Sequence, residues 1–132
     1  MNAKRLTTRE ASRAQAVGRR RVAEKYEEIA RLVATEDGTA INVSIGLAVL
    51  AGIAAGDAIC IAATGQRYSG SKHAEAADLL GRVDRQLGSK LRDLVDLKPG
   101  SHYGDDLLTS TQRTRALRAA EDLVAAARQR TT

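Results

Sequence analysis

Two short segments carry the residue types best suited to chemistry, and each holds one of the two histidines. The first is GQRYSGSKH, residues 65–73, in which five residues separate Arg67 from His73. An Arg and a His at this distance fit a site where the guanidinium holds a phosphate and the imidazole acts as a general acid or base. Lys72 adds a second cation able to meet an anion. The competing interpretation is structural, with His73 tying the loop to the rest of the fold.

The second segment, residues 98–106, contains Lys98, His102 and Tyr103 followed by two aspartates. Its spacing matches no dense ligand motif and the two histidines lie in separate loops, so we expect no metal site. His102 is a further candidate acid or base, and Lys98 and Tyr103 are candidates for ligand binding. Tyr103 is equally suited to packing its ring against one end of the fold. The chain has no Gly-rich phosphate loop or nucleophile elbow, and we expect no cofactor.

Asp57 lies inside a long apolar segment, where a carboxylate must be paired or protonated. Its candidate partners are Arg67, His73 and Tyr26, and we expect its role to be structural. Cys60, in the same segment, is expected to be a small buried side chain. A lone cysteine cannot form an intramolecular disulfide, and no apolar stretch follows the basic N-terminus directly. Both observations favour a cytoplasmic protein.

The elements that must position these residues are expected to be helical. Runs rich in Ala, Glu, Arg and Leu, a single Pro and three Tyr as the only aromatic residues favour helices with a core of small aliphatic side chains. With 132 residues, 43% of them hydrophobic and 28% charged, the chain suits one globular domain. We expect a single all-α domain over residues 1–132, folded as an up-and-down four-helix bundle with a short accessory helix and a disordered arm over residues 1–7.

Capping signals and apolar periodicity predict the helix boundaries. Thr7 and Glu10 form a capping-box pattern that starts a helix over residues 8–36. Its expected inward stripe is Val22, Tyr26, Ile29 and Val33. The later helices are expected over residues 72–87, 90–97 and 111–129, with breaks at Gly88 and at Lys98-Pro99-Gly100 and with Ser110 or Thr109 capping the last one.

The run from Thr39 to Thr64 is apolar on nearly every side, which suits either the centre of a bundle or a membrane span through residues 41–63. Gly52 and Gly56 fit close helix packing in both settings. Asp57 is costly in lipid, and the apolar stripes of the other helices need a partner to cover them. We therefore favour the central helix of a soluble bundle and expect no contact with a membrane.

The net charge is +5, and positive residues gather in the N-terminal arm, in Arg19–Arg21 and in the last helix. A basic balance permits binding of nucleic acid or another anion. The lack of interleaved aromatic residues disfavours a protein that stacks single-stranded bases. The sequence assigns no specific role to Arg19, Arg20 or Arg21.

Two stretches of the chain resemble HEPN domains. Residues 51–80, AGIAAGDAICIAATGQRYSGSKHAEAADLL, are similar to the family's second and third helices, where the third helix begins with a Ser-x-His pattern, here Ser71-Lys72-His73. Residues 97–127 are similar to the closing part, where a Tyr-bearing loop precedes a last helix with an Ala-Glu pair, here Ala120-Glu121. The resemblance covers roughly residues 15–129.

The resemblance implies an up-and-down helical bundle, often a dimer. Some members are metal-independent ribonucleases of toxin–antitoxin systems, with an Arg four to six residues before a His at the start of the last helix. Others are non-catalytic partners of minimal nucleotidyltransferases. Arg67 and His73 have the required spacing but lie between the second and third helices, and no Arg precedes His102 at that distance. The resemblance therefore implies a structural role for His73.

We expect a non-catalytic HEPN-like module that acts as a homodimer in a toxin–antitoxin or stress system. It would bind a partner protein, such as a nucleotidyltransferase or an antitoxin, or a nucleotide or RNA. The first alternative is a ribonuclease that uses Arg67 with His73, or Lys98 with His102. The second is a single-span membrane protein.

Overall fold

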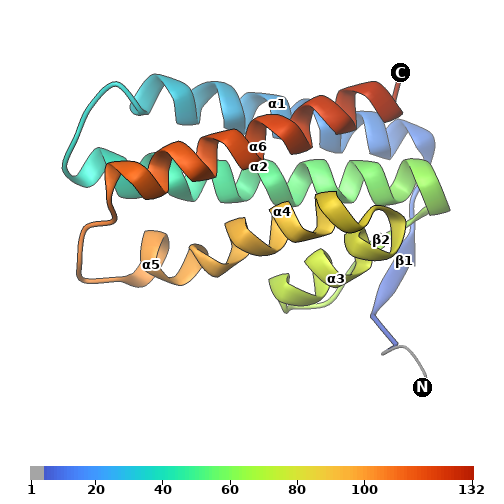
Figure 1. Cartoon of the computed structure of the whole chain (residues 1–132). Coiled ribbons are helices and arrows are strands. Elements are labelled where there is room, and N and C mark those ends of the chain that lie inside the picture. Colours follow the sequence, from blue (N-terminus) through green and yellow to red (C-terminus); the bar gives the residue numbers. More distant parts are fainter. Residues whose placement is uncertain (1–4) are drawn as a thin grey trace.

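The computed structural model describes residues 5–132, apart from the side chain of Tyr103, and most of these residues are helical. The all-α expectation is confirmed at this level. The elements in chain order are β1 (Thr8–Glu10), α1 (Arg13–Val33), α2 (Thr39–Thr64), β2 (Gln66–Tyr68), α3 (His73–Val83), α4 (Arg85–Asp96), α5 (Lys98–Tyr103) and α6 (Ser110–Arg130). Helices α1 and α6 lie along one side of α2, and α3 and α4 lie along the other (Figure 1).

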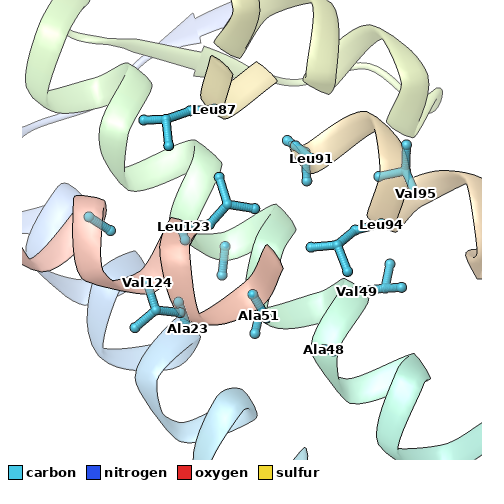
Figure 2. Close-up of a cluster of buried hydrophobic side chains, with 14 of the residues drawn as sticks. Ala23, Ala48, Val49, Ala51, Leu87, Leu91, Leu94, Val95, Leu123 and Val124 are labelled. Carbon is cyan, nitrogen blue, oxygen red and sulfur yellow. The ribbon is translucent and has the colours of Figure 1, made fainter. Parts of the chain in front are cut away.

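Helix α2 is central because nearly every side of it is apolar, and it contacts each of the other helices. Its bounds match the expected residues 39–64, and Gly65 ends it in the left-handed conformation at φ 74°. Gly52 and Gly56 let α4 approach closely. A Cβ at Gly52 would lie 2.5 Å from Cδ1 of Leu94, and one at Gly56 would lie 3.0 Å from Cδ2 of Leu91. Figure 2 shows both leucines within the buried cluster that α2 shares with α4 and α6.

Helix α2 is also the one helix of the described residues that is long and apolar enough to cross a membrane. The most apolar 18 residues of this helix have a mean hydropathy of 2.1, and 78% of that stretch is buried inside the fold. A helix buried to this extent behaves as the core helix of a soluble protein. This favours the central-helix interpretation over the membrane span.

The inward face of α1 differs from the expected one. Val22 and Ile29, expected to face the core, are 39% and 37% exposed, whereas Ala16, Ala23 and Ala30 are fully buried. The alanines let the backbones of α1 and α2 come close, and the Ser44 hydroxyl of α2 donates a hydrogen bond to the Ala30 carbonyl at 2.9 Å. The size of the apolar side chains misled the prediction, because the closest packing in this fold uses the smallest ones.

The start of the chain also departs from expectation. Residues 8–10 form β1, which pairs antiparallel with β2, instead of the first turn of a helix. Helix α1 begins after Ser12, whose side chain forms a capping box with Gln15, so Thr7 and Glu10 are not the cap. A disordered arm was expected over residues 1–7, of which positions 1–4 lie outside the described residues. Leu6, within the same stretch, is 8% exposed and packed into the fold.

The segment between β2 and α6 is arranged differently from the prediction. Helices over residues 72–87 and 90–97 were expected, but α3 ends at Val83 and Asp84 caps α4 by accepting a hydrogen bond from the Leu87 amide. Gly88 lies inside α4 instead of ending a helix, because its Cα faces Gly81 where the two helices cross. Pro99 occupies the first turn of α5, a position that tolerates proline, so residues 98–100 start a helix instead of breaking one.

Helix α6 closes the core and matches its expected bounds within one residue at each end. Thr109 is its cap and forms a capping box with Gln112. Along its length α6 is joined to α1 by ion pairs, including one between Arg128 and Glu24 at 2.9 Å. These pairs fix the side of α1 that faces α6.

Candidate functional site

A cluster of arginines surrounds Asp57, and we call Arg9, Arg19, Arg67 and Asp57 together the arginine cluster. Asp57 is 5% exposed on α2. Its Oδ2 accepts hydrogen bonds from Nε and Nη2 of Arg19 on α1, at 3.2 and 3.1 Å, and lies 3.1 Å from Nη2 of Arg67 on β2. The expected contact of Asp57 with Arg67 is therefore present. Among the described residues, neither Tyr26 nor His73, the other two expected partners, forms a hydrogen bond with the Asp57 carboxylate.

The ribbon of β1 and β2 gives the cluster its excess charge. In its register Arg9 lies directly opposite Arg67. Two like charges at directly opposed positions destabilise a strand pair, unless other charges compensate. Asp57 supplies one negative charge against three guanidinium groups, so the cluster carries a net charge of +2.

These arginines line an open pocket. Its volume is about 420 Å³, and its wall also includes Gly18 and Val22 of α1 and Ile61 of α2. The side chains of Arg19 and Arg67 are 28% and 24% exposed, so their guanidinium groups keep contact with solvent. Guanidinium groups make paired, charge-assisted hydrogen bonds to phosphate and carboxylate oxygens. The pocket is therefore suited to a small anion.

Burial sets the proton affinities on α2. It raises the pKa of the Asp57 carboxyl above its usual value, while Arg67 and then Arg19 act in the opposite direction. Burial and, to a lesser degree, the charge of Asp57 raise the pKa of the Cys60 thiol to about 12. A thiol with such a pKa is unreactive at neutral pH, so Cys60 is a core side chain and no nucleophile.

A second polar cluster lies where α3 begins, and we call His73, Lys98 and His102 the histidine cluster. Nζ of Lys98 lies 2.7 Å from Nε2 of His73. Nδ1 of His102 lies 2.9 Å from the Ser101 hydroxyl, and its ring packs 3.4 Å from the position a Cβ would take at Gly46. Burial, then the charges of Lys98 and His102, lower the pKa of His73. His73 is therefore neutral at pH 7, and Lys98 donates a hydrogen bond to it.

The two candidate residues of the loop, Arg67 and His73, thus belong to different clusters. Lys72 is exposed, and its backbone N–H donates to the Tyr68 hydroxyl at 2.9 Å, so it helps to close the turn before α3. The side chain of Tyr103 lies outside the described residues. Arg9 and Arg19 were missed as site residues because Arg19 reaches Asp57 across 38 positions of sequence and Arg9 meets Arg67 across 58. Their signal in the sequence was the gathering of positive residues in the N-terminal arm, which includes Arg9, and in the run Arg19–Arg21.

The larger pocket lies between α4 and α6 and has a volume of about 630 Å³. Its charges are balanced, with three cations and three carboxylates in the wall. One pair, Lys90 and Asp122, is joined at 2.9 Å. Within residues 5–132, side chains of His, Cys, Asp and Glu form no group of three able to hold a metal ion. The arginine pocket is therefore the site with the clearer preference for a ligand.

The arrangement of these sites is the basis for any assignment, because no family model and no curated protein matches the chain.

Proposed function

We propose that the chain is a non-enzymatic, HEPN-like helical module that binds the phosphate group of a nucleotide in the arginine pocket. The observation that carries the proposal is that Arg19 and Arg67 both bind the buried Asp57 carboxylate while Arg9, opposite Arg67, lines the same pocket, which leaves two positive charges uncompensated. A phosphate carries the charge and the acceptor oxygens that such a group of guanidiniums recognises. A pocket of about 420 Å³ is within the range of small-ligand sites.

The finer architecture belongs to the same proposal. We infer an up-and-down bundle of α1, α2, α4 and α6, with α3 and α5 as accessory helices. The order of these helices around α2 supports it (Figure 1). The resemblance to HEPN domains adds a toxin–antitoxin or stress setting in the cytoplasm, with a nucleotidyltransferase or an antitoxin as the partner.

Calorimetric titration of the purified protein with nucleoside monophosphates, nucleoside triphosphates and inorganic phosphate tests the site. We expect nucleotide binding that weakens with salt, and about a tenfold loss of affinity in Arg67→Gln, the size of one charge-assisted hydrogen bond. Asp57→Asn removes the competing carboxylate and should tighten binding. Arg115→Gln makes the same charge change at an exposed position of α6 and should leave the affinity unchanged.

Two results would refute the proposal. One is a folded wild type that binds neither nucleotide nor phosphate at millimolar concentration. The other is equal loss of affinity in Arg67→Gln and Arg115→Gln, which would show a general effect of net charge. Preferential binding of RNA over nucleotides would move the assignment to nucleic acid.

The ribonuclease alternative has one supporting observation, the 2.7 Å contact of Lys98 with His73. A cation beside a neutral imidazole resembles part of an acid–base site. The pair of Arg67 and His73 has less support, because Arg67 is bound to Asp57 and His73 to Lys98. Incubation of RNA with wild type, His73→Ala and His102→Ala decides the matter. Cleavage by the wild type that is lost in one variant would establish the enzyme.

A further inference from the structure

The outer face of α1 carries a stripe of residues that remain partly or largely exposed in the described fold. Its members recur at alternating steps of four and three residues, the spacing of a helix seam that pairs with another helix. Val22, Ile29 and Leu32 are 39%, 37% and 64% exposed, and the Lys25 side chain is 69% exposed. At Gly18 a Cβ would meet nothing within 4 Å. The stripe consists of Gly18, Val22, Lys25, Ile29 and Leu32.

The stripe is symmetric about residue 27. Val22 and Leu32 lie five positions on either side of this centre, and Lys25 and Ile29 lie two positions on either side. Two copies of α1 related by a two-fold axis at residue 27 would therefore run antiparallel. Val22 of each copy would meet Leu32 of the other, and the aliphatic stem of Lys25 would cover Ile29 of the other.

Charge selects the antiparallel arrangement. Lys25 and Glu28 are exposed and form a 2.7 Å ion pair within the chain. In the antiparallel pair, Lys25 of one copy lies within one residue of Glu28 of the second, and the symmetry makes this contact twice. A parallel pair would instead place Lys25 against Lys25, which is unfavourable.

We propose that α1 is the interface of a homodimer, in which a second copy packs antiparallel on the stripe. The occupant is a second copy because the stripe complements itself in both apolar contacts and charge. The inference does not rest on nucleotide binding. Gly18 and Val22 are shared with the pocket wall, and the variants below avoid both.

Size-exclusion chromatography with light scattering measures the oligomeric state directly. The wild type should be a dimer at micromolar concentration. Ile29→Glu and Leu32→Glu should be monomers with unchanged helical circular dichroism, because each buries a carboxylate in the interface. Leu107→Glu alters a leucine of similar exposure to Leu32, at 57% against 64%, in the loop before α6 and should remain a dimer. A monomeric wild type, or dimers of the Ile29 and Leu32 variants, would overturn the proposal.

A charge-swap mixture tests the antiparallel geometry. Lys25→Glu places two acidic groups on each seam and Glu28→Lys places two basic groups, so each variant alone should dimerise at least about tenfold more weakly. Mixed together they should form a heterodimer, although neither chain regains its internal pair. If the mixture stays as weak as the separate variants, the two-fold antiparallel arrangement is wrong. If the stripe binds a different protein and the chain does not self-associate, the proposal that a second copy covers the stripe is also refuted.

Discussion

The arginine cluster and the histidine cluster draw on one loop, yet they are built on opposite electrostatic principles. Arg67 and His73 are six positions apart in the sequence. The β1–β2 ribbon carries Arg67 to the buried Asp57, while α3 turns His73 towards Lys98. In the first cluster a carboxylate holds an excess of fixed cations, and in the second a neutral imidazole accepts a hydrogen bond from a single cation. Short sequence spacing therefore does not establish a catalytic pair, because two residues of one loop can serve two different neighbours.

The comparison predicts that each cluster can be broken without the other. The carboxylate of Asp57 is the centre of the arginine cluster, and the crossing of α3 and α4 positions the histidine cluster. A nuclear magnetic resonance titration of His73 reports on the histidine cluster alone. The His73 titration and measurements of the free energy of unfolding, made on the same variants, together show which of the two clusters a substitution disturbs.

The largest effect is expected for Asp57→Ala. Removal of the carboxylate leaves two arginines without their buried partner and should lower the free energy of unfolding by about 2–3 kcal/mol, less than for a fully buried pair because both guanidiniums reach solvent. Urea denaturation measures the loss, and the titration of His73 should not change. Asp122→Ala makes the same substitution in an exposed ion pair and should cost less than about 1 kcal/mol. Equal costs would show that the arginine cluster has no special stability.

A somewhat smaller effect is expected for Gly88→Ala. Its new Cβ would collide with the backbone of Gly81, which cannot move without separating α3 from α4, so the free energy of unfolding should fall by about 2 kcal/mol. The displaced α3 should also alter the titration of His73. Gly18→Ala is the matched control, because its Cβ enters open space and should stabilise the helix by up to about 1 kcal/mol. An unchanged His73 titration in Gly88→Ala would show that the crossing of α3 and α4 does not position the histidine cluster.

The smallest effect is expected on the stability of the protein in acidic solution. Because the pKa of His73 is lowered in the folded state, the unfolded chain binds its proton more readily. The contribution of His73 to stability is complete above its ordinary pKa of about 6.5 and is lost as the pH falls through the lower folded value. Lys98→Met removes one cause of the shift and should flatten the stability profile between pH 7 and pH 5, measured by thermal unfolding. A profile as steep as that of the wild type would show that Lys98 does not influence His73.

The sequence predicted best the features that depend on composition. Helix α2 was located by its apolar length, and the need of Asp57 for a partner followed from its burial. The predicted inward face of α1 was wrong because the prediction relied on the larger apolar residues, Val22 and Ile29, whereas alanines form the buried face. The two strands were missed because three-residue strands carry no periodic signal, and their pairing joins positions 56 to 60 apart. The end of the helix expected over residues 72–87 was misjudged because Gly88 is needed for a helix crossing, which sequence alone does not distinguish from a helix end.

Helix α6 has a consequence for biosynthesis. It is the last element of the fold, and its buried Leu123 and Val124 fill the space left by α1, α2 and α4. A nascent chain on the ribosome therefore exposes the matching faces of those three helices until α6 has emerged. Throughout that interval the partly folded chain is vulnerable to aggregation and is a natural client for a chaperone.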